Sequence, residues 1–129
     1  MTKARMVAIG LLMLASTGAA EWEHVAQLGA VNTVYVDPAR IEDKALLARI
    51  VADLLAKSGT QRPLQIDFFE DRQKTPTALP YTAEQRRHQR AKFNFIPKGS
   101  VKRFAWVEPS DPNQPGGKQR LREEPLPLP

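Results

Sequence analysis

One amphipathic segment constrains the fold of this chain more than any other feature. Between Ile41 and Lys57, apolar residues recur one and four positions apart, which places their side chains along one side of an α-helix. This apolar stripe comprises Leu46, Leu47, Ile50, Val51, Leu54 and Leu55. Because a helix with one apolar side has to bury that side against another element, the sequence predicts a helix that packs on a sheet.

Several other segments have the composition and the alternation of β-strands. The last of these segments, 101–107, is apolar on both sides, which is typical of a strand in the middle of a sheet. Phe93 and Phe95 could add a further short strand before Pro97. The four predicted strands are 21–28, 32–36, 64–69 and 101–107.

A second helix is predicted after the polar loop that follows residue 69. The Thr82 hydroxyl can cap a helix, and Gln85 three residues later completes a capping-box pattern. We expect this helix from Ala83 to about Lys92. The order β-β-α-β-α-β then predicts an α+β fold in which two helices pack on a small sheet of three or four strands. A parallel α/β sheet and an antiparallel sheet both fit this order.

The chain divides into three parts. Residues 1–20 have a basic start, an apolar run and a small-residue end, which is the pattern of a secretory signal peptide. The apolar run of about ten residues is too short to span a membrane, which takes roughly 20, and no later segment is apolar for long enough. Residues 21–108 are expected to form one globular domain, and 109–129 a disordered tail rich in proline and glycine. We therefore expect an exported protein, periplasmic or secreted, with no transmembrane segment after signal cleavage.

The absence of cysteine limits the chemistry that the chain can perform. It excludes disulfides, thiol nucleophiles and zinc sites built from thiolates. The sequence contains neither a GxGxxG motif nor a P-loop, and no HExxH motif, so no cofactor is expected. The two histidines, His24 and His88, have no neighbour in sequence that would suggest a catalytic triad.

Acidic residues collect just after predicted strands. In a parallel sheet these strand ends share one edge, where carboxylates could hold Mg²⁺ or Ca²⁺ or act as acid and base. A small metal-dependent hydrolase is therefore the alternative function. Acidic residues are also ordinary loop and capping residues, so no metal ligand is assigned. The candidates are Asp37, Asp67, Glu70 and Asp71.

Charge is distributed unevenly along the chain, whose formal net charge is +5. Residues 21–71 contain five basic and nine acidic residues, whereas residues 72–107 contain nine basic residues and one acidic residue. The second half of the predicted domain is therefore the part that would attract an acidic partner. The opposite charges of the two halves also allow head-to-tail self-association.

The basic residues of the second helix and of the following strand form the predicted contact surface. Basic and aromatic residues together can bind single-stranded nucleic acid, but nucleic acid is a poor partner for an exported protein. A protein or an anionic envelope surface fits better. We therefore expect a non-catalytic binding or accessory protein of the cell envelope. The predicted contact residues are Arg86, Arg87, Arg90, Lys92, Lys102 and Arg103, with Phe95 and Trp106 as aromatic anchors.

Overall fold

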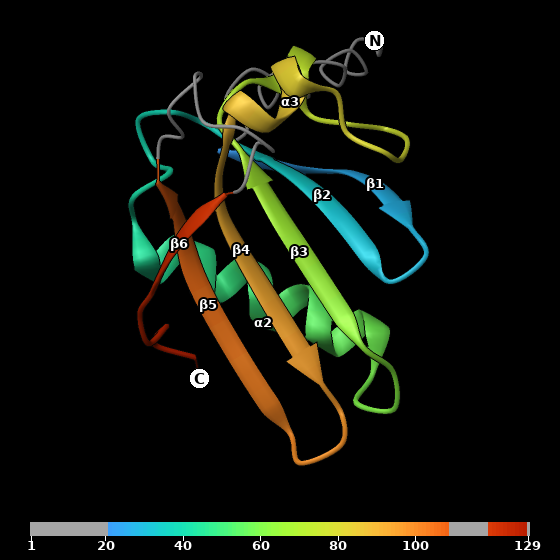
Figure 1. The fold of residues 1–129 in the computed structure, drawn as a ribbon. Coiled ribbons are helices and arrows are strands. Elements are labelled where there is room, and N and C mark those ends of the chain that lie inside the picture. Colours follow the sequence, from blue (N-terminus) through green and yellow to red (C-terminus); the bar gives the residue numbers. More distant parts are fainter. Residues whose placement is uncertain (1–20, 109–118, 129) are drawn as a thin grey trace, which may run out of the picture.

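In the part of the chain that the structure describes, one long helix lies across one face of a six-stranded sheet (Figure 1). The computed structural model describes residues 21–108 and 119–128, so the predicted signal peptide at 1–20 lies outside the described residues. The helix, α2 (Lys44–Ser58), begins where the Asp43 side chain accepts hydrogen bonds from the backbone N–H groups of Ala45 and Leu46, at 3.0 and 3.2 Å. This N-cap satisfies two donors that the first turn leaves unpaired.

The six strands are arranged in sequence order. Only one neighbouring pair, β2 and β3, is parallel, and all other pairs are antiparallel. The parallel pair follows from α2, because two parallel strands need a crossover connection and a helix is the usual one. The strands are β1 (Trp22–Leu28), β2 (Val31–Val36), β3 (Leu64–Phe69), β4 (Gln89–Ile96), β5 (Val101–Glu108) and β6 (Arg120–Glu123).

The hydrophobic core lies between α2 and the sheet, as the apolar stripe predicts. Alternate residues of four strands face the helix, because side chains along a strand point to opposite faces with a period of two. These residues are at most 8 % exposed. They are Val34 and Val36, Leu64, Ile66 and Phe68, Ala91, Phe93 and Phe95, and Phe104 and Trp106.

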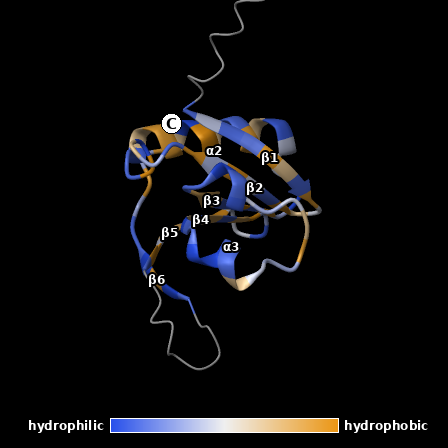
Figure 2. Ribbon diagram, turned by 90° about the horizontal axis from the view of Figure 1, so that it is seen from above, coloured by the Kyte–Doolittle hydropathy of each residue, from blue (hydrophilic) through white to orange (hydrophobic). Residues whose placement is uncertain are grey.

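The predicted fold class, a sheet of three or four strands with two packed helices, is wrong. The sheet has six strands and is mixed. The second helix, α3 (Ala83–Arg87), has the predicted capping box at Thr82 but is only five residues long and buries none of them. It lies on the side of the sheet opposite α2 and is hydrophilic (Figure 2).

The second helix ends early because β4 takes over its predicted second half. Ala91, Phe93 and Phe95 alternate along the chain, and as a strand they bury all three side chains against α2. A helix through Lys92 would turn successive residues by about 100° and could not place these three on one face. Burial of three apolar side chains therefore outweighs the local capping signal.

The sheet also continues into the C-terminal segment. Of the predicted tail at 109–129, residues 109–118 and 129 lie outside the described residues. Residues 119–128 include β6, which pairs with Ala105–Glu108 of β5. Beyond β6, Leu126 and Leu128 pack against the core. Among the helices of the described ranges, none combines the length and hydrophobicity that crossing a bilayer requires.

Candidate binding surface

The basic residues predicted as one contact surface lie in two groups at opposite ends of β4. Arg86 and Arg87 are exposed on α3, just before β4 begins. Lys102 and Arg103 are exposed at the start of β5, beyond the turn that ends β4. Figure 1 shows α3 at one end of the sheet and the β4–β5 turn at the other. The two groups would lie close together if residues 83–92 formed one helix. The helix ends at Arg87, however, and β4 begins at Gln89.

The α3 group is largely engaged within the molecule. Arg87 pairs with Glu84 at 2.8 Å, and Arg86 donates to the backbone carbonyl of Tyr81 at 2.9 Å. His88, which follows the helix, lies 3.6 Å from Glu84 and 3.7 Å from a carboxylate oxygen of Glu70. The carboxylates of Glu84 and Glu70 and the carbonyl of Tyr81 therefore lie at this end of the sheet. Their negative charge weakens the attraction of the α3 group for an acidic partner.

Arg90 is also paired on both sides. It sits in a bulge of β4, because Gln89 pairs with Phe69 and Ala91 pairs with Phe68, which leaves Arg90 without a partner in register. Its guanidinium donates to Glu70 at 2.8 Å and to Glu42 at 3.0 Å. Arg90 thus ties β4 to the loop before α2 and is not an available contact residue.

The turn between β4 and β5 and the first residues of β5 carry three cations, two of which share a pocket with Glu123 and Glu124. Lys98, Lys102 and Arg103 are exposed, and among the residues that the structure describes no carboxylate oxygen lies within 4.0 Å of their charged groups. Gly99, at φ 83°, and Ser100, at φ 50°, form the tight turn that connects Lys98 to β5, whose second and third residues are Lys102 and Arg103. We call these three residues the hairpin cations.

Lys92 lies on the open face of the sheet, the face that α2 does not cover. It is half-buried beside Asp67, its partner in register. Asp67 is 1 % exposed and accepts hydrogen bonds from the Tyr81 hydroxyl and from the Gln65 amide, the latter at 3.0 and 3.1 Å. Burial raises the pKa of Asp67, and these hydrogen bonds together with the charge of Lys92 oppose that rise. Burial and the neighbouring Asp67 also raise the pKa of Tyr81.

The two predicted aromatic anchors belong to the core. Phe95 is 2 % exposed and Trp106 is 8 % exposed, and both face α2. The Trp106 ring packs edge-on against Phe104 with a centroid separation of 5.0 Å. Lys102 lies on the same side of the sheet and lines a pocket with Phe95, whereas Lys92 and Arg103 lie on the opposite face.

The acidic residues considered for a metal site do not converge. Each has its own structural partner. Asp37 accepts a hydrogen bond from the Ala39 backbone N–H at 2.9 Å, and Asp71 caps the 3₁₀ helix η2 (Arg72–Lys74). Glu70 accepts from Arg90. Asp67 accepts from Tyr81 and Gln65. Within residues 21–108 and 119–128, no group of three or more His, Asp or Glu side chains is placed to hold a metal ion.

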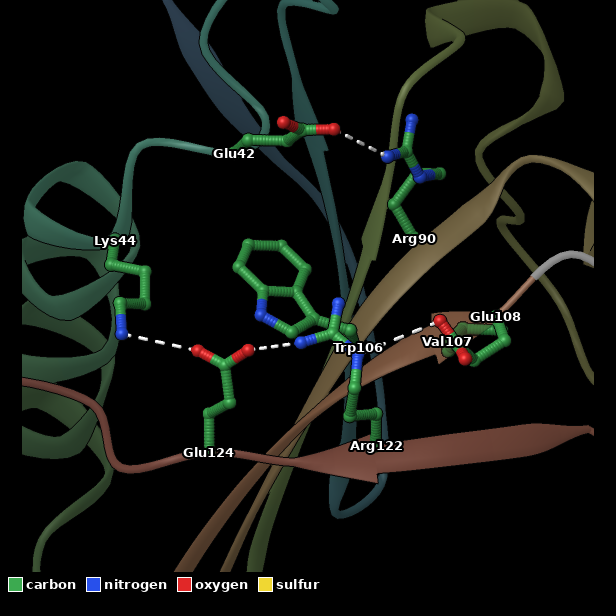
Figure 3. Close-up of a pocket in the computed structure, with 8 residues that line it drawn as sticks. All are labelled: Glu42, Lys44, Arg90, Trp106, Val107, Glu108, Arg122 and Glu124. Carbon is green, nitrogen blue, oxygen red and sulfur yellow. Dashed lines mark hydrogen bonds and ion pairs between the residues drawn. The ribbon is translucent and has the colours of Figure 1, made fainter.

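A charged pocket of about 350 Å³ lies beside Trp106 (Figure 3). Glu124 is its centre: its carboxylate accepts from Lys44 at 3.1 Å, from Arg122 and from the Trp106 side chain. Arg122 also approaches Glu108 at 3.6 Å. Hydrogen bonding to Lys44 is the main reason why the pKa of Glu124 is lowered. No local sequence pattern predicts this pocket, because residues 44, 106 and 124 lie far apart in the chain.

Comparison of the chain with protein-family models, with curated proteins and with solved structures finds no match.

Proposed function

We propose that this chain is a small exported binding protein of the cell envelope that contacts an acidic partner through the hairpin cations Lys98, Lys102 and Arg103. The exposure of these three cations, with no carboxylate within 4.0 Å in the described part of the chain, is the observation that carries the proposal. The partner is an acidic protein or an anionic envelope surface, and the protein works in the periplasm or outside the cell.

Electrostatics favours the hairpin over α3. A cation that already pairs with a carboxylate contributes little field beyond that pair, whereas unpaired cations that lie close together add their fields and steer an oppositely charged partner. The segment from residue 89 to residue 107 contains five cations and no acid. Arg90 is paired with Glu42 and Glu70, and Lys92 lies beside Asp67, whereas Lys98, Lys102 and Arg103 form no ion pair within the described residues.

The arrangement of the hairpin also suits a broad contact. Arg103 is the partner in register of Asn94, and Asn94 and Lys92 lie two residues apart on the same face of β4. Lys92 and Arg103 therefore extend the positive surface from the turn onto the open face of the sheet. Ile96, 47 % exposed, adds an apolar contact at the end of β4.

The export part of the proposal is supported by the signal-peptide pattern of residues 1–20. A cysteine-free domain is compatible with an oxidising compartment, because it has no thiol to oxidise or mispair. An N-terminal sequence of the protein isolated from its native host tests this part: a mature start at or near Glu21 is expected.

Two matched charge reversals test the contact surface. Lys102→Glu with Arg103→Glu should reduce capture of partners from envelope extracts by about tenfold, because it reverses the local field. Arg86→Glu with Arg87→Glu changes the net charge equally and should leave capture nearly unchanged. Vesicles of phosphatidylglycerol, against vesicles of phosphatidylcholine, separate an anionic lipid surface from a protein partner. Equal losses in both variants, or a loss in the α3 variant alone, would contradict the proposal.

A further inference from the structure

The last described segment of the chain occupies a groove on the α2 side of the sheet. The Glu124 backbone N–H donates to the Phe104 carbonyl at 3.1 Å, which continues the pairing of β6 beyond its last residue. Leu128 N–H donates to the Leu126 carbonyl at 2.7 Å, so the chain turns tightly around Pro127. Both leucines pack against the core, and the C-terminal end lies beside α2 (Figure 2).

The segment does not fill the space that it enters. A pocket of about 250 Å³ remains beside Leu128. Its other walls are Ala52, Leu55 and Ala56 of α2, Thr60, Phe95 of β4 and the hairpin cation Lys102 of β5. A cavity of about 150 Å³ is enough to hold a benzene molecule in a protein core. The pocket therefore has room for a side chain larger than leucine at this position.

The segment is also held by comparatively weak contacts. All four residues of β6 are exposed, and Leu121 is 48 % exposed. Glu124 anchors the segment through Lys44, but both side chains of this pair are partly exposed, and exposed ion pairs contribute little to stability. Backbone pairing with β5, one carboxylate and two half-buried leucines are thus the contacts that a competing peptide would have to replace.

We propose that the edge of β5 with which β6 pairs and the pocket between α2 and Phe95 form a peptide-binding site, which residues 119–128 occupy within the same chain. The site takes an extended peptide of another protein that adds a strand to β5, places a carboxylate beside Lys44 and Trp106, and continues with two apolar residues separated by proline. An aromatic residue at the second apolar position fills the pocket better than Leu128 does. This is strand addition with side-chain pockets, a common mode of peptide recognition.

The chain's own segment sets the affinity that a partner must overcome. Because it is tethered, it competes at an effective concentration of the order of millimolar. A peptide in solution should therefore bind the intact protein weakly and should bind much more tightly once the segment is released. The site is consequently regulated by the C-terminal residues of the chain.

The test uses the full chain and two labelled peptides. One peptide has the sequence of residues 119–129, and the other carries the substitution Leu128→Phe. Fluorescence anisotropy should show that the protein variant Leu126→Ser with Leu128→Ser binds the first peptide at least tenfold more tightly than the wild-type protein does. The phenylalanine peptide should bind the same variant more tightly than the leucine peptide.

Circular dichroism establishes that the released variant keeps its fold. A folded variant that binds neither peptide would overturn the proposal, and so would equal binding to the variant and to the wild type. If the variant does not fold, millimolar phenylalanine peptide added to the wild-type chain should shift the NMR signals of Ala52 and Phe95, and unchanged signals would overturn the proposal. Dimers formed by exchange of residues 119–128 would assign the site to a second copy and overturn it as well.

Discussion

Replacement of Phe93 by alanine tests the assignment of residues 89–96 to a strand. Phe93 is 1 % exposed and lies in the middle of β4, between Ile66 of β3 and Phe104 of β5 in register. Truncation removes a fully buried aromatic side chain and leaves a cavity, which costs about 3–5 kcal/mol of unfolding free energy. Because small domains are stable by only about 5–15 kcal/mol, the change should lower the urea midpoint strongly.

Asn94→Ala provides the matched control. Asn94 is half-buried and points to the open face, so its truncation should cost less than about 1 kcal/mol. Urea unfolding followed by the fluorescence of the two tryptophans, Trp22 and Trp106, measures both variants. Equal costs, or a larger cost for Asn94, would refute the alternation on which the β4 assignment depends.

Two further predictions concern single residues. Asp67 has a raised folded-state pKa, so the folded protein binds this proton more tightly than the unfolded chain does, and the contribution of Asp67 to stability falls as pH rises from about 4 through its folded-state pKa. Asp67→Asn should therefore gain stability relative to the wild type between pH 4 and pH 7 in thermal unfolding, and a constant difference would contradict this. Gly59 ends α2 at φ 84° and ψ 174°, a conformation that only glycine adopts readily. Gly59→Ala should cost about 1–3 kcal/mol although a Cβ has open space there, whereas Ala56→Gly on exposed helix surface should cost about 1 kcal/mol.

The sequence predicted the core helix and its partner strands for a simple physical reason. The stripe from Leu46 to Leu55 and the alternation of Leu64, Ile66 and Phe68 are local patterns, and burial of these side chains is what the fold requires. The second helix was predicted from its cap at Thr82, which the structure retains. A cap shows where a helix begins but says little about its length, and Ala91, Phe93 and Phe95 decide that β4 begins at Gln89.

The candidate surfaces were harder to predict, because they depend on contacts between residues far apart in the sequence. Arg90 meets Glu42 across 48 positions, and Lys44 meets Glu124 across 80. Neither ion pair can be predicted from a local pattern in the sequence. The excess of cations in residues 72–107 was visible in the sequence, but which of them remain unpaired depends on where the acids fold.

The pairing of the C-terminal segment with β5 was also hard to predict from the sequence. The prolines and glycines of the tail argue against a packed structure, and four residues of β6 with no buried side chain carry little hydrophobic pattern. The open edge of β5 supplies the backbone partners that these residues need, and an edge strand without a cover is a surface that proteins tend to pair.

The most direct test of the proposed function is the salt dependence of partner binding by the wild type and by the Lys102→Glu, Arg103→Glu variant. If the hairpin cations form the contact, wild-type binding to the captured partner or to phosphatidylglycerol vesicles should weaken steeply as ionic strength rises, because salt screens exposed charges. The variant should bind weakly at every salt concentration. Wild-type binding that does not change with salt, with the variant indistinguishable from it, would contradict the account.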